Sequence, residues 1–137
     1  MSSPRYLLDT NICIFIRQNR VPSVVERFRS LGFGEAAISV VSYGELSYGA
    51  QKSRQRELAV NGLQTLLAFM PVLPLPRDAG NAYGSIRAAL ERRGNTIGGN
   101  DLWIAAHALS ASLILVTSNE REFRRVDGLQ VENWAAT

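Results

Sequence analysis

Short apolar runs alternate along most of the chain with longer segments of helical period. The apolar runs predict strands at residues 6–8, 36–39, 72–75, 113–117 and 130–134. Apolar spacing of three and four residues predicts helices at about 11–17, 22–31, 43–52, 55–69, 78–93 and 101–112. Strands separated by helices indicate an α/β fold, with an open, mostly parallel sheet of about five strands and helices on both faces.

The composition fits one soluble domain. The 137 residues are 46% hydrophobic, which is enough for a real core, so we expect a single domain over residues 1–137. No apolar run approaches the roughly 20 residues that cross a membrane, and no signal peptide is evident, so a cytoplasmic protein is expected. The single cysteine, Cys13, excludes an internal disulfide framework. Its apolar neighbours predict a core position.

The charge changes this picture only slightly. The formal net charge is +3, and only Lys52 among the 15 basic residues is not an arginine. Arginine binds phosphate in a bidentate manner, and excess positive charge favours an encounter with nucleic acid. Solvated helix faces would produce the same composition, so charge alone does not establish a nucleic-acid partner.

Three carboxylates, Asp9, Glu45 and Asp101, stand where predicted helices begin. In a parallel sheet the strand-to-helix junctions gather at the carboxyl edge, where sites commonly form. Carboxylates brought together repel one another unless a cation lies between them, and hard oxygen ligands suit Mg²⁺ or Mn²⁺. The pattern therefore predicts a divalent-metal site built from these three side chains.

Helix capping offers an alternative interpretation of each carboxylate. Asp9 is a favoured N-cap residue, and Asn100 with Asp101 could cap the helix that they precede. Ser42 and Glu45 have the spacing of a capping box, which needs no metal. One side chain can both cap a helix and bind a metal, and the combination of three such residues favours the metal site.

Several segments carry a resemblance to a known family. Residues 7–11 (LLDTN), 42–50 (SYGELSYGA) and 97–108 (IGGNDLWIAAHA) are similar to the three acidic motifs of PIN-domain ribonucleases, in particular the VapC-type toxins of toxin–antitoxin pairs. Residues 115–123 and 131–134 are similar to a common VapC tail. The resemblance spans the whole chain in the expected order.

The resemblance implies a metal-dependent endoribonuclease with Asp9, Glu45 and Asp101 as metal ligands. Many PIN domains have a fourth acidic residue just after the strand predicted here at 113–117, in a Thr-x-Asp arrangement, and this position is Asn119 in the present chain. Asn119 is included in the expected site, and the adjacent Glu120 is a candidate to replace the missing charge. Side chains expected to orient the carboxylates, the water or the phosphate are Thr10, Asn11, Thr117 and Ser118.

The family also implies partners. VapC-type proteins are typically homodimers that cleave structured RNA, often tRNA. They are inhibited by a VapB-type antitoxin, through which the complex also binds operator DNA. We expect these partners and no membrane. Two other functions stay open: a metal-dependent phosphatase with Asp9 as nucleophile, and a non-catalytic RNA- or protein-binding module, which the neutral Asn119 makes conceivable.

Overall fold

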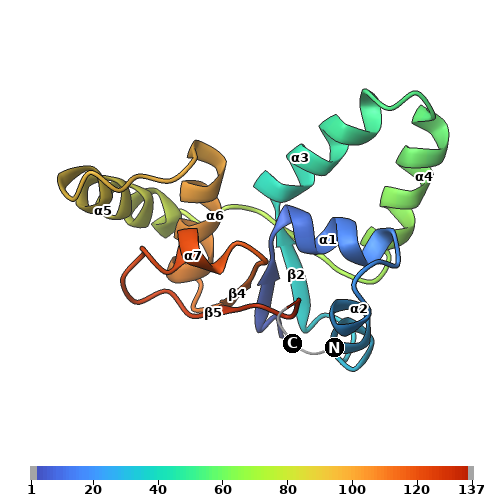
Figure 1. The fold of residues 1–137 in the computed structure, drawn as a ribbon, viewed down its shortest axis with the longest axis horizontal. Helices are drawn as coiled ribbons and strands as arrows, with labels where there is room; N and C mark the ends of the chain where they lie inside the picture. The colour runs from blue at the N-terminus through green and yellow to red at the C-terminus, as the bar shows by residue number, and fades with distance from the viewer. Residues whose placement is uncertain (1–2, 136–137) are drawn as a thin grey trace.

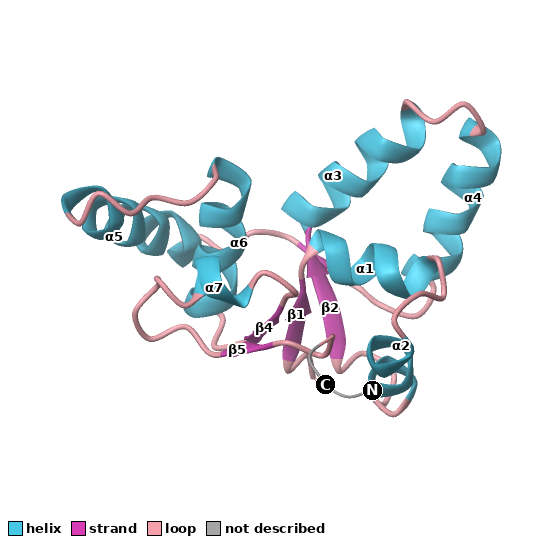
Figure 2. Cartoon of the chain, in the orientation of Figure 1, coloured by secondary structure: helices cyan, strands magenta, loops and turns pink. Residues whose placement is uncertain are grey.

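A computed structural model describes residues 3–135, in which strands and helices alternate along the chain (Figure 1, Figure 2). In chain order the elements are β1 (Tyr6–Leu8), α1 (Thr10–Arg17), α2 (Pro22–Arg29), β2 (Ala36–Ser39), α3 (Val40–Gln51), α4 (Arg56–Leu67), β3 (Val72–Leu73), α5 (Asp78–Arg92), α6 (Gly99–Ser110), β4 (Ile114–Val116), α7 (Glu120–Phe123) and β5 (Val131–Glu132). No helix in this part of the chain is long and apolar enough to cross a membrane.

The five strands form one sheet in the order β3-β2-β1-β4-β5, and every neighbouring pair is parallel. In the central strand β1, Tyr6 lies opposite Ala36 of β2 on one side and Ile114 of β4 on the other. The α/β prediction is confirmed. The chain moves outward from β1 in one direction and then returns to its other side, so the carboxyl ends of β1 and β4 lie next to each other at a point where sites form in such sheets.

Helices pack on both faces of the sheet and create two apolar layers. Leu7 faces a layer built with α5, α6 and α7, whereas Tyr6 and Leu8 face a layer built with α1, α2, α3 and α4. Figure 1 shows the two helix groups on opposite sides of the strands. Cys13 is fully buried in the second layer, which confirms its predicted core position.

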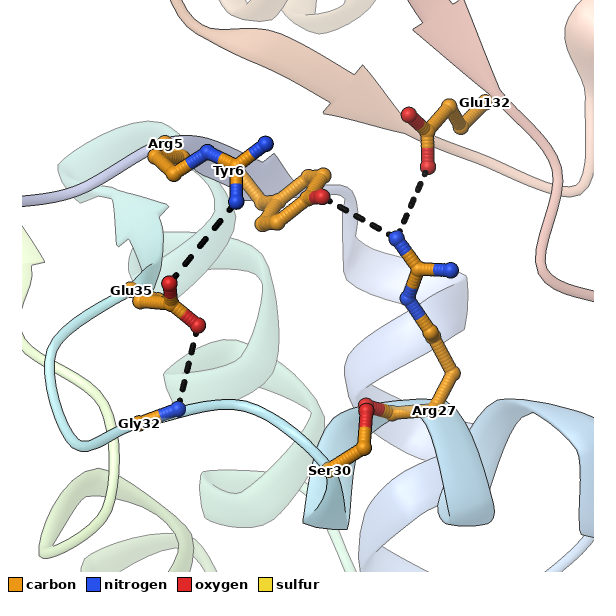
Figure 3. A network of polar contacts seen from close by, with 7 residues as sticks. All are labelled: Arg5, Tyr6, Arg27, Ser30, Gly32, Glu35 and Glu132. Atoms are coloured by element: carbon orange, nitrogen blue, oxygen red, sulfur yellow. Dashed lines mark hydrogen bonds and ion pairs between the residues drawn. The ribbon is translucent and has the colours of Figure 1, made fainter.

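A polar network secures the last strand to the second layer (Figure 3). The Arg27 guanidinium donates a hydrogen bond of 3.0 Å to the Tyr6 hydroxyl and lies 3.7 Å from the Glu132 carboxylate. It also lies over the rings of Tyr6 and Trp134. Arg27 therefore joins α2, β1 and β5 through contacts on both its planar face and its edge.

The predicted elements differ from the observed ones mainly at their ends. Helix α3 begins at Val40 rather than at residue 43, because the Ser39 hydroxyl accepts a hydrogen bond from the Val41 N–H at 3.1 Å and caps the helix there. The strands β3 and β5 have only two residues each. The four-residue helix α7 was not predicted at all.

Candidate active site

Asp9 lies at the carboxyl end of the central strand and is almost completely buried. One carboxylate oxygen accepts a hydrogen bond of 3.0 Å from the Ile12 N–H, so Asp9 caps α1 as one interpretation predicted. The other oxygen accepts a hydrogen bond from the Thr117 hydroxyl at the end of β4. Burial raises the pKa of Asp9, and these two hydrogen bonds oppose that rise.

Glu45 is the sixth residue of α3, so the expectation that it begins a helix is wrong. The capping-box interpretation is wrong as well, because Ser39 rather than Ser42 caps α3 and Ser42 lies inside the helix. The Thr10 hydroxyl donates a hydrogen bond of 2.6 Å to the Glu45 carboxylate. Since Thr10 directly follows Asp9, this contact brings the second carboxylate towards the first.

Asp101 lies in the first turn of α6, whose N-cap is Gly98, so Asp101 does not cap the helix. The pKa of Asp101 is raised to about 7, most strongly by burial and then by the adjacent carboxyl of Glu122. The negative charges of Glu45 and Asp9 raise it further. Acidic groups from β1, α3 and α6 therefore act on one another at one edge of the sheet.

Glu122, which the sequence interpretation missed, is the fourth acidic group of this cluster. Its carboxylate accepts hydrogen bonds from the Gly98 N–H at 3.3 Å and from the Asn119 side-chain amide. Glu120, the candidate suggested by the sequence, instead forms an ion pair of 3.0 Å with Arg124. The spacing of three residues between Asn119 and Glu122 is the sequence signal, since it places both on one face of a short helix.

The segment after β4 connects Asp9 to Glu122. Asn119 donates its backbone N–H to the Thr117 hydroxyl oxygen at 2.9 Å, while its side chain holds Glu122. Thr117 is fully buried, and its hydroxyl donates a hydrogen bond to the Asp9 carboxylate. Within residues 3–135, no hydrogen bond joins the side chains of Asn11 or Ser118 to the four carboxylates, although the Asn11 backbone contributes to the environment of Asp9.

The carboxylate oxygens of the site suit a hard divalent cation, but the side chains are spaced too widely to form a closed metal site. Among the described residues 3–135, no three acidic, histidine or cysteine side chains form a ready-made metal site. Mg²⁺ characteristically keeps several waters and uses only one or two carboxylates directly, so carboxylates spaced around a hydrated ion fit its chemistry. Burial and then the neighbouring carboxyl groups raise the pKa of Asp101, so a bound cation would favour its ionised form.

Comparisons with known proteins identify the family of the chain. The family model described as "PIN domain" matches residues 6–129. The chain is 44% identical to the tRNA(fMet)-specific endonuclease VapC of Shigella flexneri, covering 96% of this chain and 98% of that protein. It is 39% identical to the ribonuclease VapC2 of Haemophilus influenzae, covering 95% and 98%.

Solved structures of similar proteins have the same fold. The DNA-bound VapBC of Salmonella typhimurium superimposes with a TM-score of 0.89 at 38% identity, covering 96% of this chain and 98% of that chain. VapBC2 of Rickettsia felis, bound to a DNA fragment from its promoter, gives a TM-score of 0.88 at 35% identity, covering 94% and 98%. The chain therefore belongs to the PIN-domain family, among the VapC-type ribonucleases of toxin–antitoxin pairs.

Proposed function

We propose that this protein is a Mg²⁺-dependent endoribonuclease that hydrolyses phosphodiester bonds of RNA, and of tRNA in particular. The observation that carries the proposal is the gathering of Asp9, Glu45, Asp101 and Glu122 at the carboxyl edge of the sheet. Burial and the neighbouring carboxyl groups raise the pKa of Asp9 and of Asp101 there. The carboxyl groups of such a cluster can all be ionised stably only when a cation lies between them.

Asp9, Glu45 and Asp101 would hold the ion, directly or through water, and Glu122 would contribute the fourth negative charge. When bound, Mg²⁺ lowers the pKa of a water molecule and neutralises charge that develops on phosphate oxygens; Mn²⁺ can supply the same chemistry. The Thr117 hydroxyl holds Asp9, the Thr10 hydroxyl holds Glu45, and the Asn119 amide holds Glu122. These neutral donors orient the carboxylates without cancelling their charge.

The choice of tRNA rests on a relative and on charge. The similar protein of Shigella flexneri is named a tRNA(fMet)-specific endonuclease. The net charge of +3 and the exposed arginines near the site, including Arg121 and Arg124 beside Glu122, favour binding to an RNA backbone. The same chemistry on the same ligands would serve any RNA that reaches the carboxylates.

We also propose that a VapB-type antitoxin controls the protein, since its structural relatives are VapBC complexes. A cavity of about 640 Å³ between α1, α2 and α4 is lined mainly by apolar side chains, including Phe28 and Phe69, and by Arg17 and Arg29. It suits an apolar segment of the antitoxin flanked by acidic residues. Homodimer formation, contact with operator DNA through the antitoxin and a cytoplasmic location complete the proposal.

The test is cleavage of a total tRNA pool by the purified protein in Mg²⁺, beside Asp101→Asn and a sample containing EDTA. The asparagine keeps the shape of the side chain but removes the charge that a metal needs. Discrete fragments from the wild type alone would support the proposal, and their ends would identify the target. Hydrolysis of small phosphate esters without RNA cleavage would indicate a phosphatase, and chelator-independent RNA binding alone would indicate a binding module.

A further inference from the structure

The only histidine of the chain forms a buried polar contact between two site-bearing helices. His107 in α6 is 1% exposed, Ser39 at the start of α3 is fully buried, and Nδ1 of His107 lies 2.9 Å from the Ser39 hydroxyl oxygen. We call this contact the Ser39–His107 bridge. Burying a histidine and a serine side chain among apolar groups lowers the stability of the fold unless their polar atoms form hydrogen bonds.

The hydrogen-bonding capacity of the two side chains is well matched. The Ser39 oxygen already accepts the Val41 N–H, so its own proton is free to be donated to Nδ1 of a neutral imidazole. Burial lowers the pKa of His107, which favours that neutral form. In this arrangement Ser39 caps α3 and bonds to α6 at the same time.

The bridge is equally far along each helix from a carboxylate of the site. Glu45 follows Ser39 by six residues, and Asp101 precedes His107 by six residues. At a rise of about 1.5 Å per residue, each carboxylate-bearing position is about 9 Å along its helix from the bridge. A relative tilt of about 6° at the bridge would therefore move a carboxylate by about 1 Å, a displacement that can cost about 100-fold in rate.

We propose that the Ser39–His107 bridge sets the separation between Glu45 and Asp101, which makes His107 a positioning residue for the metal site. Apolar packing between α3 and α6 has no strong orientation, whereas one buried hydrogen bond defines a single distance and direction. Glu45 belongs to a helix of one apolar layer, and Asp101 belongs to a helix of the other. The bridge is thus a directional contact between the two layers close to the site. The inference rests on the proposed metal-dependent function.

The experiment measures Mn²⁺ binding to the metal-free protein by the electron paramagnetic resonance signal of free Mn²⁺, so it needs no RNA. His107→Leu fills the space without a hydrogen bond, whereas His107→Asn places an amide near the former Nδ1 position and can bond to Ser39 again. Ser39→Ala breaks the bridge from the other side and also removes the cap of α3. The double variant Ser39→Ala/His107→Leu tests whether His107 acts only through its contact with Ser39. Thermal melting of each variant verifies that it is folded.

We expect His107→Leu to weaken Mn²⁺ binding about 10-fold or more, with binding largely restored in His107→Asn. The double variant should bind no more weakly than the weaker single variant, because the bridge can be lost only once. In RNA cleavage, His107→Leu should raise the half-saturating Mg²⁺ concentration while leaving the KM for RNA unchanged.

Two outcomes would overturn the inference in different ways. Equal Mn²⁺ affinity in the wild type, His107→Leu and Ser39→Ala would show that the bridge does not position the site, while the proposed function would stand. A folded wild type that binds no Mn²⁺ would refute the metal-dependent function and the bridge's role with it. If His107→Leu does not fold, His107→Met takes its place in the comparison with His107→Asn, because Ser39→Ala also removes the cap of α3.

Discussion

Replacing Asp101 with asparagine should stabilise the metal-free protein at pH 8, although the same change removes a proposed metal ligand. Burial and the neighbouring carboxyl of Glu122 raise the pKa of Asp101 to about 7, compared with an ordinary value of 3.8. Between these values the folded protein retains a proton that the unfolded chain releases. The free energy of unfolding therefore falls as the pH rises from about 4 to about 7, and this loss is complete above pH 7.

The size of the effect follows from the raised pKa and the exposure of the side chain. At about 1.36 kcal/mol per pH unit, the difference corresponds to an upper bound of about 4 kcal/mol. Asp101 is only partly buried, and solvent screening reduces this to about 1–2 kcal/mol. In a domain of this size, Asp101→Asn should therefore raise the Tm at pH 8 by roughly 3–8 °C, and the gain should shrink as the pH falls towards 4.

The assay is thermal unfolding with and without Mg²⁺ at several pH values. Mg²⁺ at ten times its Kd should stabilise the wild type by about 1.4 kcal/mol and leave Asp101→Asn nearly unchanged. Asp127→Asn is the matched control, because the Asp127 side chain is 89% exposed. Its Tm at pH 8 should equal that of the wild type, and Mg²⁺ should stabilise it equally. An Asp101→Asn protein that melts at or below the wild-type temperature at pH 8 would refute the argument that crowded carboxylates oppose folding.

Three further predictions concern single residues. Glu122→Gln should reduce Mg²⁺-dependent cleavage about 10-fold or more, whereas Glu120→Gln should cleave like the wild type; equal losses would contradict the assignment of Glu122 to the site. Ser112 follows α6 with a φ of 57°, a left-handed conformation that glycine adopts without strain. Ser112→Gly should therefore raise the free energy of unfolding by about 0.5–1 kcal/mol in a urea titration. A lower free energy of unfolding would show that the Ser112 backbone is not strained. Arg27→Ala should lower the free energy of unfolding by about 1–2 kcal/mol, because it removes the contacts with the Tyr6 and Trp134 rings and a hydrogen bond. The Mg²⁺ concentration needed for cleavage should not change; a change would show that α2 influences the site.

The order of elements and the position of Asp9 could be predicted because local signals agreed there. The apolar run 6–8 is followed at once by a residue that favours helix capping, and the structure has both a buried strand and a cap at Asp9. Asp101 could likewise be placed near the start of a helix, since Gly98 and Gly99 precede a strongly apolar helical segment. The sheet order and the contact between β1 and β4 needed the tertiary structure.

The start of α3 could not be predicted because Val40 and Val41 have β-branched side chains that continue the apolar run of β2. The capping bond from Ser39 outweighs their strand preference, and it turns the chain into a helix three residues earlier than expected. The position of Glu45 within the helix changes accordingly. Local propensity carries too little free energy to settle such a boundary by itself.

Glu122 could not be recognised because its role depends on contacts with distant parts of the chain. A helix of four residues has almost no periodic signal, and Glu120 and Glu122 look equivalent in sequence. Glu120 forms an ion pair with Arg124, one turn later in the chain. Glu122 instead accepts hydrogen bonds from the Gly98 N–H and the Asn119 amide, which hold it beside Asp101. The choice between two nearby acids is therefore made by tertiary packing.

The two apolar layers have a consequence for the dynamics of the protein. Asp101 and Glu122 belong to helices of one layer, Glu45 belongs to a helix of the other, and Asp9 ends the strand between them. A cation held by all four would add a second link between the two layers, beside the Ser39–His107 bridge. Amide protons of both α6 and α3 should then exchange with solvent more slowly when Mg²⁺ binds, so the ion would reduce local unfolding in helices well beyond the side chains that it contacts.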